Sequence, residues 1–207
     1  MKNKIAPCGA FFIFAFTMIY CYINRRFNGE KMRKILKTFA AIFGIVLLDQ
    51  IAKGILLFLI TGSAFAVGPA WSVVPVPYLM ARVTNFFNVV FTWNPGTAFS
   101  LFRGLGDNIP LIMIIATGAI IGILLYYLIV RAKDYERTPL IFIVGGALGN
   151  FVDRLRFGAV VDFLDFHIGG AHWPSFNVAD AFITIGVLLY ILNWWLTRRR
   201  CLKNLKG

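Results

Sequence analysis

Two aspartates stand in the otherwise apolar stretch AVVDFLDF, residues 159–166. An apolar setting disfavours the charged form of a carboxyl group and raises its pKa, which is one way that proteins prepare reactive acids. Asp162 stands between Val161 and Phe163 with no cation beside it, so we expect its pKa to rise. If this stretch is a strand, Asp162 and Asp165 point to opposite faces, and only one of them can face a site built by helix ends.

Another aspartate, Asp180, begins an apolar run that is typical of a helix. Asn177 is well placed to cap this helix, and Asp180 then falls in the first turn, where the helix dipole favours an acid. Capping alone could account for Asp180, but we also expect it to lie at the same depth as Asp162. Two neighbouring carboxyl groups cannot both ionise cheaply, so one keeps a proton while the other acts as a base toward water. The residues therefore predict acid–base hydrolysis by Asp162 and Asp180.

Other charged residues in the apolar segments could support this chemistry. Asp49 and Lys53 are four residues apart, so on a helix they share a face and can pair. This pair is either a structural contact between helices or a polar wall of the site. Asp153 is followed directly by Arg154 and should stay ionised, which suits an orienting role.

Rival chemistries find less support in the sequence. There is no GxSxG motif, and Ser100 and Ser175 have no obvious histidine partner. His167 and His172 could bind a metal with the nearby aspartates, but no HExxH motif is present. A transporter with a proton relay would need ionisable groups across the membrane, whereas the acids here gather toward one side.

The composition is that of a membrane protein. The chain has 207 residues, of which 59% are hydrophobic and 14% charged, and its mean hydropathy is +0.75. Soluble domains have about 45–50% apolar and about 25% charged residues. The net charge of +12 could suggest nucleic acid, but the basic residues gather at the ends of apolar runs, so we expect no nucleic-acid partner. The cysteines Cys8, Cys21 and Cys201 have no metal-like or redox spacing.

Four apolar segments are long enough to span a bilayer as helices, which needs about 20 residues. They run over about 36–61, 109–130, 138–155 and 179–196, and Pro139 falls in the first turn of the third. Basic residues precede the first, link the second to the third and follow the fourth, so the positive-inside rule puts these parts in the cytoplasm. The loops at about 62–108 and 153–178 then lie outside. In these loops, residues 82–94, 97–102 and 158–168 predict strands, with a turn at Asn94–Gly96 between the first two.

The segment before the first helix has no assigned role. Residues 6–23 are apolar and form either an additional helix or a signal-like segment. Translation could also begin at Met32. We therefore divide the chain into an extension, residues 1–31, and one integral-membrane domain, residues 32–207.

Five separated blocks, taken together, resemble the lipoprotein signal peptidase family (signal peptidase II), over about residues 32–199. Each block alone is weak, but their order and spacing on four helices are specific. The blocks are DQIAK at 49–53, NPGTAFS at 94–100, GGALGNFVDR at 145–154, GAVVDFLDF at 158–166 and FNVADAFITIG at 176–186.

The resemblance implies a four-helix membrane bundle with a small extracytoplasmic β-cradle, in the bacterial inner membrane. It implies an aspartic endopeptidase that removes signal peptides from diacylglyceryl-modified prolipoproteins, just before the lipidated cysteine, without metal or cofactor. Asp162 and Asp180 match the catalytic aspartates, and Asp165 is then expected to face a loop or water. We expect contact with membrane lipid, sensitivity to globomycin-type cyclic peptides and a monomeric enzyme. Residues that match supporting positions of the family are Asp49, Lys53, Asn94, Asn150, Asp153, Arg154 and Asn177.

Overall fold

The computed structural model describes residues 29–63, 68, 70–73, 78–96 and 109–204. The apolar segment 6–23 and the expected strand 97–102 lie outside the described residues. The chain divides into two compact units, residues 1–40 and 41–207. The candidate site belongs entirely to the second unit, which is the one described below.

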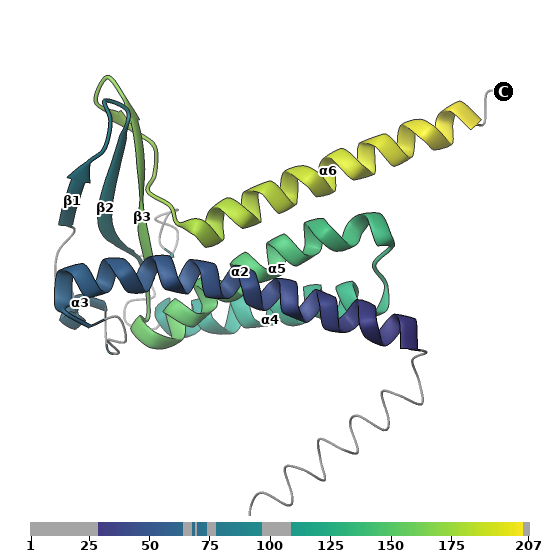
Figure 1. Ribbon diagram of the computed structural model, residues 1–207, viewed down its shortest axis with the longest axis horizontal. Coiled ribbons are helices and arrows are strands. Elements are labelled where there is room, and N and C mark those ends of the chain that lie inside the picture. Colours follow the sequence, from purple (N-terminus) through teal and green to yellow (C-terminus); the bar gives the residue numbers. More distant parts are fainter. Residues whose placement is uncertain (1–28, 64–67, 69, 74–77, 97–108, 205–207) are drawn as a thin grey trace, which may run out of the picture. The chain divides into compact units, whose positions relative to one another are not determined.

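Within the described residues there are four long helices and one short helix (Figure 1). They are α2 (Gly29–Thr61), α3 (Ala70–Val73), α4 (Ile109–Val130), α5 (Asp134–Phe157) and α6 (Val178–Asn204). Among the described residues, α2, α4 and residues 178–199 of α6 are long and apolar enough to cross a membrane. The chain is thus a multi-pass membrane protein, but α5 does not meet the same criterion.

Helix α5 begins earlier than the sequence predicts. It starts at Asp134 rather than Thr138, so Pro139 lies in the second turn instead of the first. The earlier start is fixed by Glu136, whose Oε2 accepts the backbone N–H of Lys133 at 2.8 Å. Because Pro139 has no N–H, it cannot donate to the carbonyl of Tyr135 within the helix. That oxygen accepts a hydrogen bond from Asn193 Nδ2 of α6 at 2.7 Å instead.

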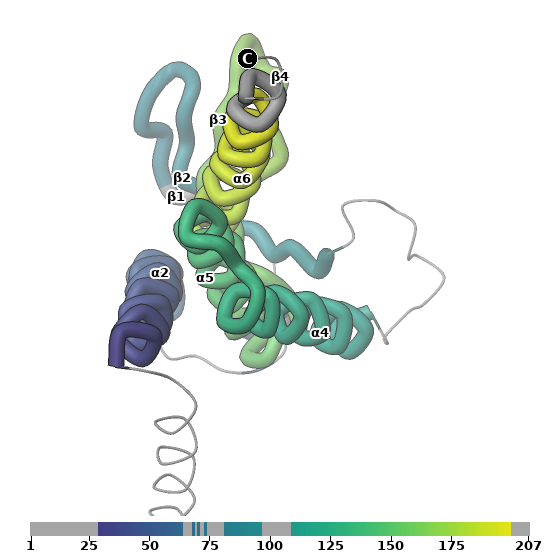
Figure 2. The backbone as a smooth tube through the Cα atoms, turned by 90° about the vertical axis from the view of Figure 1, so that its right-hand side faces the viewer, coloured from purple at the N-terminus to yellow at the C-terminus, as the bar shows by residue number. Residues whose placement is uncertain are grey.

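Glycines let α5 pack closely against its neighbours. Helix α5 lies beside both α4 and α6 (Figure 2). A Cβ atom on Gly146 would collide with the carbonyl oxygen of Ala179 in α6. On Gly145 it would lie 2.9 Å from Ile45, and on Gly149 it would lie 2.7 Å from Asp49, both in α2. Close approach through small residues is a common way for helices to associate in membranes.

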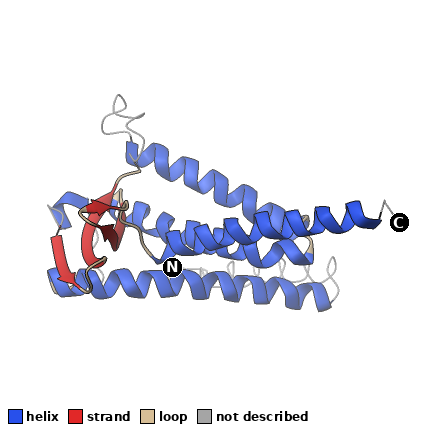
Figure 3. Cartoon of the chain, turned by 90° about the horizontal axis from the view of Figure 1, so that it is seen from above, coloured by secondary structure: helices blue, strands red, loops and turns tan. Residues whose placement is uncertain are grey.

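The strands form a small antiparallel sheet, as expected (Figure 3). Its order is β1 (Tyr78–Arg82), β2 (Phe87–Asn94), β3 (Val160–Ile168) and β4 (Ala171–His172). The expected strand at 82–94 is interrupted at residues 83–86, so β2 pairs with the upstream β1. The expected turn is present, since Gly96 has a φ of 85° and its N–H donates to Asn94 Oδ1 at 2.9 Å.

The apolar core beneath the sheet orients β3. Phe91, Trp93, Phe157, Val161 and Phe163 are buried together with Leu56 and Leu57 of α2. Because Val161 and Phe163 contribute to this core, alternation turns the side chain between them to the other face of the sheet. That side chain is Asp162.

Candidate active site

Asp162 lies almost completely buried on β3, with 2% of its surface exposed. Its Oδ2 accepts a hydrogen bond from Asn94 Nδ2 at 2.9 Å, and its Oδ1 accepts one from Asn177 Nδ2 at 2.7 Å. Asn94 is the last residue of β2, and Asn177 directly precedes α6. Three elements therefore meet at this one carboxyl group.

Asp180 lies in the first turn of α6, where a reciprocal cap begins the helix. The backbone N–H of Asp180 donates to Asn177 Oδ1 at 2.9 Å, and the backbone N–H of Asn177 donates to Asp180 Oδ2 at 3.3 Å. This is the capping role that the sequence predicts for Asn177. The cap also holds the Asp180 carboxyl group at the mouth of the helix.

Two buried amides connect Asp162 with Asp180. Because Asn177 Oδ1 caps Asp180, its Nδ2 is left to donate to Asp162. Asn150 of α5 donates from Nδ2 to Asp180 Oδ1 at 2.8 Å, and its Oδ1 accepts from Asn177 Nδ2 at 3.0 Å. The hydrogen-bond partners of each amide fix which end donates and which end accepts. The two amides therefore also fix the positions of the Asp162 and Asp180 carboxyl groups relative to each other.

Lys53 is completely buried and binds two acids. Its Nζ lies 2.8 Å from Asp49 Oδ2 and 2.8 Å from Asp153 Oδ2, and all three side chains have no exposed surface. The same Nζ donates to Asn150 Oδ1 at 3.1 Å. The expected pairing of Asp49 with Lys53 is confirmed. The cation that pairs with Asp153 is Lys53 of α2 rather than the neighbouring Arg154.

Arg154, a supporting residue implied by the family resemblance, follows Asp153 in α5. Its Nη1 lies 3.4 Å from the carbonyl oxygen of Asn150, one turn earlier in α5. Its charge acts on Asp180, Asp153 and Asp162. Among the described residues, its buried Nε has no hydrogen-bond partner.

The setting of Asp162 changes its protonation. Burial, together with the nearby charge of Asp180, raises the pKa of Asp162 from 3.8 to about 7. The hydrogen bonds from Asn94 and Asn177 act in the opposite direction but do not cancel this effect. A carboxyl group with this pKa holds its proton in a large part of the molecules at neutral pH.

Asp165, which was expected to face a loop or water, is buried with partners on the neighbouring strands. It is 5% exposed and accepts hydrogen bonds from Asn88 Nδ2 at 2.8 Å and from His172 Nδ1 at 2.8 Å. It pairs across the sheet with Asn88, whereas Asp162 pairs with Thr92, and none of the site residues above is among its hydrogen-bond partners. Asp165 is thus a buried acid with its own partners on the sheet.

One residue of this network was missed from the sequence. Gln50 donates to Asp153 Oδ1 at 2.9 Å and to the carbonyl oxygen of Gly149 at 3.2 Å. Its position beside Asp49 in the DQIAK block was the available signal. Within the described residues, no group of three His, Cys, Asp or Glu side chains is arranged to hold a metal.

The fold and the site together define a class of protein. Apolar helices pack beside a small sheet, and a strand aspartate and a helix-cap aspartate share the amide of Asn177. Such a pair of carboxyl groups can activate water, so the class is that of membrane enzymes with paired aspartates.

The particular family follows from comparison with known proteins. Residues 41–196 match the family model described as Signal peptidase (SPase) II, and the chain belongs to this family. The lipoprotein signal peptidase of Francisella tularensis subsp. novicida is 44% identical over 122 residues, which cover 58% of this chain and 76% of the relative. That of Rickettsia felis is 36% identical over 181 residues, 85% of each chain.

Solved structures agree with this assignment. A bacterial membrane enzyme with 29% sequence identity superimposes with a TM-score of 0.58 and covers 76% of this chain and 92% of its own. A second bacterial membrane enzyme structure, at 28% identity, has the same TM-score and covers 78% of this chain and 88% of its own.

Proposed function

We propose that Asp162 and Asp180 are the catalytic pair of this signal peptidase II. The enzyme removes signal peptides from prolipoproteins, as the names of its relatives indicate. The bond cut is the one just before the cysteine that carries diacylglycerol. The observation that carries the assignment is the shared amide of Asn177, which binds Asp162 through Nδ2 and Asp180 through Oδ1 and the backbone.

The raised pKa of Asp162 suggests a division of labour between the two acids. Asp162 holds the proton and transfers it to the carbonyl oxygen of the scissile bond as water attacks. Asp180 is ionised and takes a proton from water, whose oxygen attacks the carbonyl carbon. The proton taken by Asp180 then passes to the leaving nitrogen as the peptide bond breaks. Asp162 recovers its proton when the tetrahedral intermediate collapses.

The supporting residues keep the pair in place during this reaction. Asn94, Asn150 and Asn177 direct N–H groups at the two carboxyl groups. Lys53, Asp49 and Asp153 form the buried charged base beneath them. Arg154 adds positive charge near the acids of the site. In this proposal, cleavage needs neither a metal nor a cofactor.

The direct test uses purified protein and a diacylglyceryl-modified prolipoprotein, with cleavage followed by gel shift. We expect Asp162→Asn and Asp180→Asn each to abolish cleavage while the protein stays folded. Asp165→Asn is the matched control, since it changes an equally buried acid of the same strand, and it should cleave normally. Cleavage retained by both of the first two variants would refute the assignment.

Inhibition and metal dependence separate this proposal from a metal hydrolase. A globomycin-type cyclic peptide should block cleavage, and a chelator should leave it unchanged. The opposite pattern would favour a metal-dependent hydrolase, using residues outside those assigned above. We also propose that the protein acts as a monomer in contact with membrane lipid.

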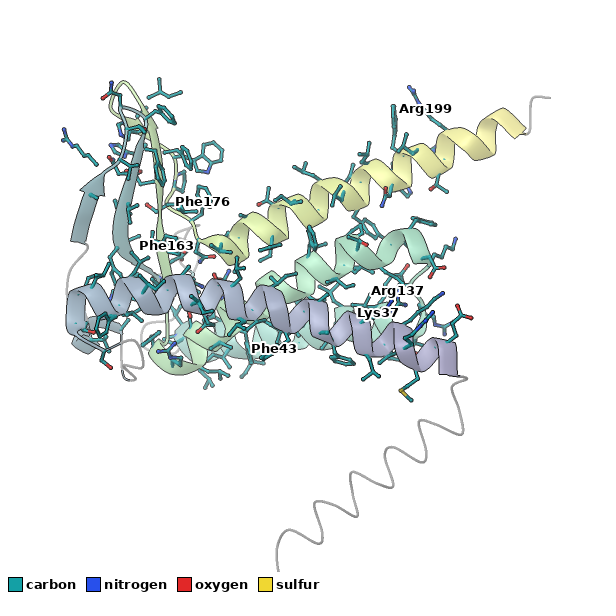
Figure 4. All side chains as sticks on the ribbon, viewed as in Figure 1. Lys37, Phe43, Arg137, Phe163, Phe176 and Arg199 are labelled. Carbon is teal, nitrogen blue, oxygen red and sulfur yellow. The ribbon has the colours of Figure 1, made fainter. Side chains whose placement is uncertain are left out.

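The membrane arrangement extends this proposal. We propose that α5 is a fourth crossing, that the sheet is the extracytoplasmic β-cradle of the family, and that the C-terminus is cytoplasmic in a bacterial inner membrane. The apolar stretch of α5 between Arg137 and Asp153 is short, but both of its ends carry charges suited to an interface. Figure 4 supports this, since Arg137 and Arg199 lie at the ends of α5 and α6 away from the sheet.

A further inference from the structure

Gln50 of α2 lies against both acids of the buried charged base. Its Nε2 is 2.9 Å from Asp153 Oδ1 and 3.3 Å from Asp49 Oδ2. Its Oε1 accepts a hydrogen bond from Arg156 Nη1 at 3.1 Å. We propose that Gln50 is a positioning residue, which bridges Asp49 and Asp153 beside Lys53 and so sets the spacing of the two catalytic aspartates. This inference rests on the function proposed above for Asp162 and Asp180.

The two bridged acids each hold the backbone next to one catalytic aspartate. Asp153 Oδ2 accepts the N–H of Val161 at 3.1 Å, and Val161 directly precedes Asp162. Asp49 Oδ1 accepts the N–H of Ala179 at 3.0 Å, and Ala179 directly precedes Asp180. Whatever fixes the distance between Asp49 and Asp153 therefore fixes the distance between the two catalytic backbones.

Lys53 alone does not satisfy this pair of acids. One ammonium group serves two acids, and all three groups are completely buried. Buried carboxylate oxygens without a donor are costly, and like charges repel. Gln50 Nε2 lies within hydrogen-bond distance of both acids and of the carbonyl oxygen of Gly149, and the amide adds no charge. Arg156 binds its Oε1, so the Nε2 end must face the acids.

The variant Gln50→Leu tests this role, because leucine has a similar size and no N–H group. A small displacement of reacting groups lowers the rate steeply, so we expect kcat to fall by about 10- to 100-fold. KM should stay within about twofold, because Gln50 acts on the two catalytic aspartates and not on bound substrate.

The variant Gln50→Glu keeps the shape of the side chain but adds a third acid, so it should lower kcat further than Gln50→Leu does. The matched control is Ile51→Ala, the adjacent exposed residue of α2, which has no polar group to offer.

A double-mutant cycle distinguishes positioning from a general loss of stability. If Gln50 acts through Asp153, the effect of Gln50→Leu on kcat should be much smaller in an Asp153→Asn background than in the wild type. All rates are expressed per folded protein, from the amplitude of the thermal melt. If Gln50→Leu does not fold, the variant Arg156→Gln is used in its place. Arg156→Gln removes the guanidinium that holds Gln50 Oε1, so the Gln50 amide can turn and kcat should again fall.

Three results would overturn the inference: wild-type kcat in Gln50→Leu, a raised KM at unchanged kcat, or additive effects in the cycle. These outcomes are separate from the test of the catalytic pair. If Asp162→Asn and Asp180→Asn are inactive while Gln50→Leu is fully active, the proposed function stands and only the role of Gln50 is refuted. If the two aspartate variants retain cleavage, the proposed function itself fails.

Discussion

At the scale of single residues, the two acids of β3 show how the same side chain takes different roles. Asp162 shares the amide of Asn177 with Asp180, and burial and the charge of Asp180 raise the pKa of Asp162 to about 7. Burial also acts to raise the pKa of Asp165, but hydrogen bonds from His172 and Asn88 outweigh it and lower the pKa below the usual value. The sequence separates the two acids by strand alternation, but it does not show the partners of Asp165, which come from β2 and β4.

The pKa of Asp162 predicts how activity depends on pH. Because this pKa is raised to about 7, the protonated form exists below that value and is lost as the pH increases through it. The proposed mechanism needs this proton, so kcat/KM should fall above about pH 7, by up to about tenfold for each further pH unit. Measurement of kcat/KM from pH 5 to 9 checks this. A rate that instead increases through pH 7 would assign the role of base to Asp162.

The partners of Asp165 predict an effect on stability rather than on catalysis. Asp165→Asn weakens buried hydrogen bonds to Asn88 and His172, which should cost about 1–2 kcal/mol at neutral pH. The pKa of Asp165 is lowered, so its stabilising effect is present above pH 4 and is lost as the pH falls through the folded pKa. Thermal melts at pH 7 and pH 3 should therefore show a gap between wild type and variant that closes in acid. Loss of cleavage in a folded Asp165→Asn protein would contradict this view.

At the scale of elements, periodicity and apolar length predicted some boundaries better than others. Helix α4 begins and ends as expected, at Ile109 and Val130, because an unbroken apolar run defines it. The start of α5 was placed four residues late, because its first turn is polar and is fixed by Glu136. The pairing of Asp153 with Lys53 joins residues a hundred positions apart, so the adjacent Arg154 was a misleading guide.

The glycines of α5 predict a difference between positions that look alike in sequence. Both Gly118–Gly122 and Gly145–Gly149 have the spacing of helix contacts, but nothing lies within 4 Å of a Cβ placed on Gly122. On Gly146 a Cβ would meet the carbonyl oxygen of Ala179, which precedes Asp180. Gly146→Ala should therefore cost about 1–3 kcal/mol and lower kcat about tenfold or more. Gly122→Ala is the control and should change neither the melting temperature nor kcat. Equal behaviour of the two variants would refute close packing at α5.

At the scale of the whole molecule, the distribution of charge predicts how the chain lies in the membrane. Basic residues follow α4 and α6, while the sheet connects α5 to α6. The positive-inside rule places the 131–137 connection and the C-terminus in the cytoplasm and the sheet outside. This arrangement requires α5 to cross the membrane, although α5 does not meet the criterion for a membrane span that the other three helices meet.

Cysteine labelling in intact cells tests this arrangement and the crossing by α5 together. In a variant without the native cysteines, a cysteine at Ile168, which is 83% exposed at the tip of the sheet, should react with a membrane-impermeant maleimide from outside. A cysteine at Lys133, in the connection before α5, should react only after the membrane is opened. Since Lys133 and Ile168 lie on either side of α5, opposite accessibility means that α5 crosses. If both cysteines are labelled from the same side, α5 does not cross the membrane, and the chain has the three crossings made by the other long helices.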